Sequence, residues 1–272
     1  MSGTSEAPAG RDGLPFVAPC RQLAPTAPFR WVRLAIDDLR RAWPQSLLYG
    51  TAMALIIAAV SVAAWRYGTH WLMLAMLSGF VFLAPLGCIG LYALSAQLER
   101  RQPPSLSRSL KAAFRRHLGN EMIFALVLLV IFFTWARAGM MVIAFTVPTT
   151  GTTAADLAGV LGVGSIIGAL FAAITYSVSA FSLPMIMHRD VDTITAIVTS
   201  VNAVLRNKVA MLVWLSLIVV ALLLGLLTAF VGLVVLLPVI GFAAWHGYLE
   251  TIDATAFPRH AVGITAVPRR QT

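Results

Sequence analysis

Two clusters of ionisable side chains lie at the ends of long apolar runs and are the first candidates for chemistry. The first cluster consists of His188, Arg189, Asp190 and Asp192. The second consists of His246, Tyr248 and Glu250. If the two runs adjoin as helices, their imidazole and carboxylate groups would form a site for a divalent metal. Helix caps, ion pairs and interfacial anchors are the alternative, and the dispersed spacing favours it because neither an HExxH motif nor a paired-carboxylate helix is present. We therefore predict no metal site and no catalytic residue among them.

Arg137, in "FFTWARAGMM", is the one charged residue inside an apolar run. An ionisable group within a membrane is a candidate functional residue by default. Arg137 lies about 22 Å along a helix from Met122, toward the far leaflet, where a long side chain can extend to the surface. Two roles stay open: snorkelling or pairing, with Asp156 as the nearest acidic partner, and a place in a polar pathway. The first is favoured.

Cofactor chemistry is not predicted. Axial ligation of haem needs histidines inside the membrane spans. The five histidines instead lie at the ends of apolar runs or in the tails: His70, His117, His188, His246 and His260. Cys20 lies in the N-terminal tail and Cys88 in an apolar run, so no disulfide between them and no metal spacing is expected. No nucleophile elbow or P-loop is present. We expect no cofactor and no enzymatic activity.

Gly164 and Gly168, in "GVGSIIGALFAA", have the small-xxx-small spacing of closely packed membrane helices. The spacing predicts a close helix contact. The partner helix can belong to this chain or to another one.

The elements that hold these residues belong to a very apolar chain. Hydrophobic residues make up 59% of its 272 residues and charged residues 11%, against about 45–50% and 25% in soluble domains. Uncharged runs of 18 or more residues predict membrane-spanning helices. Six are expected, at about 46–65, 71–96, 122–145 and 157–187, and two within 209–245. The last run is too long for one crossing, so a turn is predicted near 225–232. A membrane domain of residues 29–250 lies between a disordered tail (1–28) and a second tail (251–272).

Basic residues are distributed unevenly between the connections. Of the 20 Lys and Arg residues, 18 lie before the first span, after the last one, or in the second and fourth connections, while Arg66 alone lies on the other side. The positive-inside rule therefore places both termini in the cytoplasm. We attribute the net charge of +9 to this topology and to contact with anionic lipid headgroups. Nucleic acid is not an expected partner, because no basic domain with interleaved aromatic residues lies outside the spans.

A short amphipathic helix is predicted before each pair of spans. The apolar faces consist of Phe29, Val32, Ile36, Leu39 and Trp43; of Leu106, Leu110, Phe114 and Leu118; and of Ile194, Ile197, Val198, Val201 and Leu205. Asp190 or Asp192 is suited to cap the third helix. The predicted fold is thus all-α, with six transmembrane helices in three units of an amphipathic helix and a hairpin. The amphipathic helices are expected in the cytoplasmic interface, either to cap the bundle or to form a docking surface.

Four stretches resemble a family of uncharacterised bacterial six-span inner-membrane proteins. They are "WPQSLLYG" (43–50), "GLYALSAQLERRQPPSLSRSL" (90–110), "SLPMIMHRDVDTITAIVTSVNAVLRNKVAMLVWLSLIV" (182–219) and "GFAAWHGYLE" (241–250). The resemblance extends from about residue 29 to 250. It implies a fold and a location in the bacterial inner membrane, and it assigns no catalytic residue.

The predicted function is non-enzymatic. Because little polar chemistry lies within the spans and charge is concentrated at one face, we expect a scaffold, an assembly factor or a lipid-organising protein. Its expected partners are anionic headgroups and a membrane protein complex. A small transporter for a lipid-like or small solute is the alternative, with Arg137 and the glycine-rich fourth span along its path.

Overall fold

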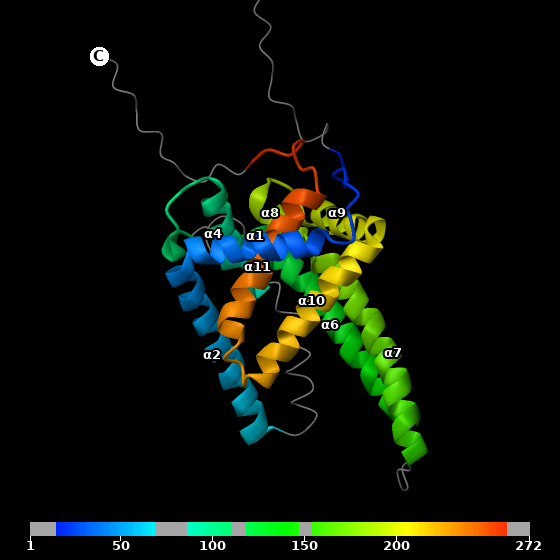
Figure 1. Cartoon of the computed structure of the whole chain (residues 1–272). Helices are drawn as coiled ribbons and strands as arrows, with labels where there is room; N and C mark the ends of the chain where they lie inside the picture. Colours follow the sequence, from blue (N-terminus) through cyan, green and yellow to red (C-terminus); the bar gives the residue numbers. More distant parts are fainter. Residues whose placement is uncertain (1–14, 69–85, 110–117, 147–153, 260–272) are drawn as a thin grey trace, which may run out of the picture.

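The structure, a computed structural model, describes residues 15–68, 86–109, 118–146 and 154–259. These residues fold almost entirely into helices (Figure 1). The helices are α1 (Ala27–Arg41), α2 (Trp43–Tyr67), α4 (Ile89–Glu99), α6 (Leu118–Thr146), α7 (Ala154–Ser179), α8 (Ser182–His188), α9 (Thr193–Arg206), α10 (Lys208–Leu227) and α11 (Leu233–Thr251). The predicted all-α class is confirmed.

Within the described residues, five helical stretches are long and apolar enough to cross a membrane. They are Trp43–Tyr67, Gly119–Val142, Leu161–His188, Lys208–Leu227 and Leu233–Thr251. The chain is therefore a multi-pass integral membrane protein. The remaining predicted span, 71–96, falls mainly outside the described residues, and only its end is seen, in α4. Six spans and three helix-plus-hairpin units thus stay predictions.

The predicted division of the last apolar run into two helices is confirmed. Helix α10 ends at Leu227 and α11 begins at Leu233. The reversal uses left-handed backbone at Ala229 and Phe230, with φ of 48° and 70°. The Thr228 hydroxyl accepts a hydrogen bond from the Gly232 amide at 2.9 Å. One polar side chain thereby satisfies a backbone donor at the turn.

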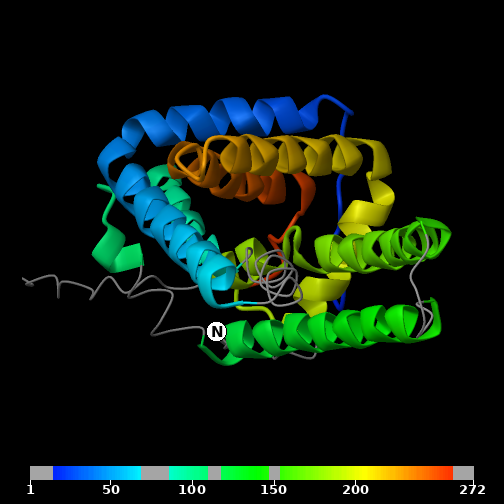
Figure 2. The ribbon, with the colours of Figure 1, turned by 90° about the horizontal axis from the view of Figure 1, so that it is seen from below.

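Short helices gather at one end of the long ones (Figure 1). We call this part the end layer: residues 15–26, α1, α8, α9 and residues 252–259. Helix α1 lies across α11 and runs beside α10 in the view from below (Figure 2). Trp31 of α1 is fully buried, and its ring meets Trp214 and Phe181 edge-to-face with centroids 5.7 and 6.2 Å apart. Gly247 makes this crossing possible, because a Cβ there would lie 2.9 Å from the Trp31 ring.

The N-terminal tail differs from expectation where the structure describes it. In the segment expected to be disordered, Ala18 is buried, and its amide donates to Thr199 Oγ1 at 3.1 Å. The Leu23 amide donates to Asn207 Oδ1 at 2.8 Å. At the other end, the Asp253 amide donates to the carbonyl of Pro19 at 2.9 Å. Residues 15–26 and 252–259 are ordered because they satisfy their backbone groups on each other and on α9.

Helices α1 and α9 are packed in an unusual orientation. The protein-facing side of α9 is made of small and polar residues: Thr193, Thr195, Ala196, Thr199, Ser200, Ala203 and Val204. On its opposite side, Ile194 and Leu205 are 61% and 57% exposed. In α1, Ala27, Pro28, Trp31, Ala35 and Asp38 are buried, whereas Phe29 and Ile36 are exposed. Each predicted apolar stripe is therefore divided: its exposed members are turned away from the protein, whereas Val32, Leu39, Ile197 and Val201 pack against the core.

Candidate functional site

Asp38 of α1 is the centre of a buried polar cluster in the end layer. It is only 6% exposed. Its Oδ2 atom accepts a hydrogen bond from Ser95 Oγ at 2.8 Å and contacts His246 Nε2 at 2.8 Å. The cluster joins α1, α4 and α11, which are far apart in sequence. Ser95 and His246 bind the same carboxylate oxygen, so this arrangement ties three helices together.

Glu250 forms a second connection between α1 and α11. Its Oε1 and Oε2 atoms pair with the Arg30 guanidinium. Oε2 also accepts a hydrogen bond from the indole nitrogen of Trp31 at 3.0 Å. The buried Trp31 ring needs a partner for its N–H group, and Glu250 supplies it. The carboxylate therefore acts as an anchor for α1.

His188 packs against a different side of α11 from His246. His188 Nδ1 lies 2.9 Å from the Tyr248 hydroxyl, and its ring centroid is 5.4 Å from that of Trp245. Residues 246 and 248 project from α11 in nearly opposite directions. The two histidines therefore do not converge. In the described ranges, no group of three His, Cys, Asp or Glu residues is placed to hold a metal ion.

The other members of the first cluster stabilise the loop after α8. Arg189 is buried, and its guanidinium donates to the carbonyl of Phe257 at 2.7 Å. Asp192 is the N-cap of α9 and accepts from the Thr195 amide at 2.9 Å, which is one of the two caps predicted. Asp190 is exposed, and its amide donates to Pro258. In the structure these residues therefore cap α9 or hold the loop after α8 against residues 257–258.

Arg137 and the α7 glycines lie outside the end layer. Arg137 is an exposed residue of α6, and no ion pair with it is seen among the side chains that the structure describes. A Cβ added at Gly164 or Gly168 would meet nothing within 4 Å. The described helices therefore supply no close partner for this small-xxx-small face. A partner outside this chain stays a prediction.

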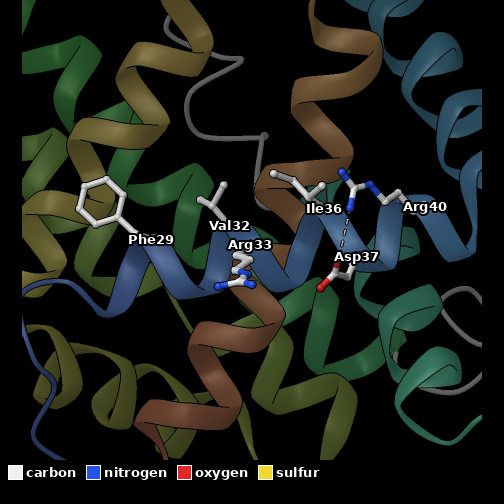
Figure 3. A pocket seen from close by; sticks show the side chains of 6 residues that line it. All are labelled: Phe29, Val32, Arg33, Ile36, Asp37 and Arg40. Carbon is white, nitrogen blue, oxygen red and sulfur yellow. Dashed lines mark ion pairs between the residues drawn. The ribbon is translucent and has the colours of Figure 1, made fainter.

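Sequence reasoning missed a groove on α1 that becomes visible in the structure (Figure 3). The groove is open, with a volume of about 400 Å³, and six residues line it: Phe29, Val32, Arg33, Ile36, Asp37 and Arg40. The three apolar side chains form one row along the helix, with Arg40 beside Ile36, whereas Arg33 and Asp37 lie on the other side (Figure 3). Arg40 Nη1 lies 3.6 Å from Asp37 Oδ1. The alternation of apolar and basic residues in 29–41 was the available signal.

Fold and site together define a helical, multi-pass integral membrane protein with a polar cluster and an amphiphilic groove at one end. Residues 72–188 match the model of a family described as "Predicted integral membrane protein (DUF2189)", a domain of unknown function. This match confirms the resemblance to uncharacterised membrane proteins. No curated protein and no solved structure matches the chain.

Proposed function

We propose that the protein is a non-enzymatic, lipid-organising protein of the bacterial inner membrane, with both termini and the end layer on the cytoplasmic side. The observation that carries this proposal is the exposure of large apolar side chains on one side of α1 and α9, namely Phe29, Ile36, Ile194 and Leu205. In water, an apolar stripe would face the protein and a polar one the solvent. Here the sides are reversed in α9, which suits a helix lying at the surface of a membrane.

The use of polar groups supports the same function. Several acidic and histidine side chains near the end layer are engaged within the chain: Asp38 with His246, Glu250 with Arg30, and His188 with Tyr248. Several basic side chains are exposed. Arg33 and Arg41 are exposed on α1, and Arg206 is exposed at the end of α9. Such residues attract anionic headgroups.

Lipid contact of the stripes can be tested by depth-dependent quenching. Single cysteines would replace Phe29, Leu205 or Phe16 in a Cys20→Ala/Cys88→Ala background, and each would carry an environment-sensitive fluorophore in liposomes. Phe16 is 64% exposed in the N-terminal segment and serves as the control. Lipids spin-labelled near the headgroup should quench the labels at 29 and 205 but not the label at 16. Equal quenching at all three sites would contradict the proposal.

The orientation has a separate test with the same Phe16→Cys variant. A membrane-impermeant maleimide should label it in inside-out vesicles and not in right-side-out ones. The reverse pattern would place the end layer outside and overturn the cytoplasmic assignment while leaving lipid contact intact.

A transporter is the second candidate, supported by Arg137 on α6 and by the open glycine face of α7. An Arg137→Ala variant that folds normally but no longer supports flux of a small or lipid-like solute would favour it. Unchanged behaviour of this variant, together with loss of function on Ile197→Asp, would favour lipid organisation.

A further inference from the structure

We infer that the groove on α1 binds one anionic phospholipid, with its phosphate at Arg33 and Arg40 and an acyl chain along Phe29, Val32 and Ile36. This inference rests on the proposed lipid-organising function and assigns it a site. Phe29, Val32 and Ile36 recur at the i, i+3, i+7 spacing, and Arg33, Asp37 and Arg40 recur at i, i+4, i+7. The apolar set therefore forms a continuous row on the helix, and the charged set borders it.

The groove faces the part of the molecule that lies in the membrane. In Figure 3, Phe29, Val32, Ile36 and Arg40 point toward the side along which α2 and α10 extend, whereas Arg33 and Asp37 lie on the other side of α1. An acyl chain entering from the bilayer would therefore meet the apolar row first. The headgroup would stay at the level of α1, with Arg40 beside the apolar row and Arg33 on the outward side, as in a lipid at its normal depth.

The charges favour an anionic headgroup. The charged set has two guanidinium groups and one carboxylate, so its net charge is positive. Arg33 has no ion pair in the described part of the chain. The contact between Arg40 and Asp37 is long, at 3.6 Å, and the Arg40 side chain is 77% exposed. Such a surface pair is weak, so Arg40 is available to a phosphate, which guanidinium groups bind in a bidentate manner.

The opposite side of α1 makes the groove a preformed site. Trp31, Ala35 and Asp38 are buried on that side, and the Asp38–His246 and Trp31–Glu250 hydrogen bonds fix the rotation of the helix. The buried side of α1 thus fixes the position of the groove residues, and their own side chains stay free to contact a ligand. A fixed helix loses little entropy when a ligand binds.

Native mass spectrometry of protein released from nanodiscs of equimolar phosphatidylglycerol and phosphatidylethanolamine tests the assignment. The wild type should retain one phosphatidylglycerol in preference to phosphatidylethanolamine. Arg33→Gln/Arg40→Gln should lower this occupancy by about fivefold per arginine. Arg33→Lys/Arg40→Lys should keep part of it. Arg66→Gln, an exposed arginine at the end of α2, removes a charge elsewhere and should leave it unchanged.

The apolar row has its own matched pair. Phe29→Ser should lower retention, whereas Leu34→Ser, a substitution at an exposed residue on another side of α1, should not. Excess inorganic phosphate should leave the lipid bound, because phosphate lacks the acyl contact. Displacement by phosphate, equal retention of the two lipids, or equal loss in the Arg66→Gln variant would each overturn the inference.

The two proposals can fail separately. If labels at 29 and 205 are not quenched by lipid, the lipid-organising function itself is wrong. If they are quenched but Arg33→Gln/Arg40→Gln retains phosphatidylglycerol like the wild type, the function stands and the specific site is wrong.

Discussion

The end layer with α11 and the hairpin of α6 and α7 are built differently. Half of the apolar stretch of α11 is buried within the protein, against 11% of that in α6. Trp31, Trp245 and Tyr248 are fully buried around α11. On α7, by contrast, Ile166 and Leu170 are 73% and 58% exposed. Contacts within the chain determine the first region, and lipid is the expected environment of the second.

This difference separates residues that hold the fold from residues that face the membrane. In the end layer, glycines and aromatic side chains fit each other closely, and polar groups bond across helices. On the outer face of the hairpin, residues need only be apolar. Substitutions of the same chemical type should therefore have unequal effects in the two regions, which matched pairs can measure.

The largest effect is expected from Trp31→Ala. The Trp31 side chain is fully buried, contacts two aromatic rings and donates to Glu250. Removing it leaves a cavity and takes one of the hydrogen bonds from the Glu250 carboxylate, so the free energy of unfolding should fall by about 3–5 kcal/mol. Trp43→Ala, at a site that is 61% exposed, is the control and should change it by less than about 1 kcal/mol. Thermal unfolding in detergent would measure both. Equal losses would show that burial does not distinguish these positions.

A glycine pair sharpens the comparison further. A Cβ at Gly50 of α2 would lie 2.0 Å from the Val234 carbonyl oxygen, a backbone atom that cannot rotate away. Gly50→Ala should therefore separate α2 from α11 and cost about 1–3 kcal/mol. Gly168→Ala on α7 meets open space and should be neutral or slightly stabilising. The same unfolding assay would compare the two. A loss at Gly168 in native membranes but not in detergent would indicate a partner helix from another chain.

Asp38→Ala tests the buried polar cluster at a smaller magnitude. It removes the acceptor shared by Ser95 and His246 and leaves their side chains unpaired. The expected loss is about 2 kcal/mol. Asp37→Ala is the control, because the Asp37 carboxylate makes only an exposed pair with Arg40. This substitution should change the free energy of unfolding by less than about 1 kcal/mol. If Asp37→Ala is the more damaging of the two, the cluster does not stabilise the end layer.

The features that sequence could predict are local ones. The Asp192 cap precedes its helix by one position, and the turn between α10 and α11 follows from the length of an uncharged run. Composition and hydropathy alone indicated the membrane class. In each case the residues that decide the structure lie within a few turns of one another.

The features that sequence could not predict depend on distant partners. Asp38 pairs with a histidine 208 residues away, and nothing in either local pattern indicates the other. Residues 15–26 have the composition of a disordered tail, yet their amides find acceptors on Thr199 and Asn207. The apolar stripe of α1 was apparent from its periodicity, but its protein-facing side is decided by Trp31, whose ring fits over Gly247.

Cys20 offers the test with the smallest effect on stability. Its thiol is buried in the N-terminal segment and donates to the Thr199 carbonyl at 3.8 Å. Burial is the main reason that the pKa of Cys20 is raised from 9.0, opposed by Asn202 and Arg206. A raised pKa in the folded state means that the stabilisation is complete below pH 9 and is lost as the pH rises above it. At neutral pH the thiol is uncharged in both the folded and the unfolded chain.

Cys20→Ala should therefore change stability by less than about 1 kcal/mol at pH 7, whereas the labelling rate of the native thiol should change strongly with folding. Two single-cysteine proteins are compared: Cys88→Ala, which keeps Cys20, and Phe16→Cys in the Cys20→Ala/Cys88→Ala background. Maleimide should react with Cys20 at a rate roughly tenfold or more below that of the thiol at position 16, since only an exposed thiolate reacts. Denaturant should remove the difference. Equal rates in the folded protein would mean that residues 15–26 are not docked on α9. This segment would then be exposed, like the outer face of the α6–α7 hairpin.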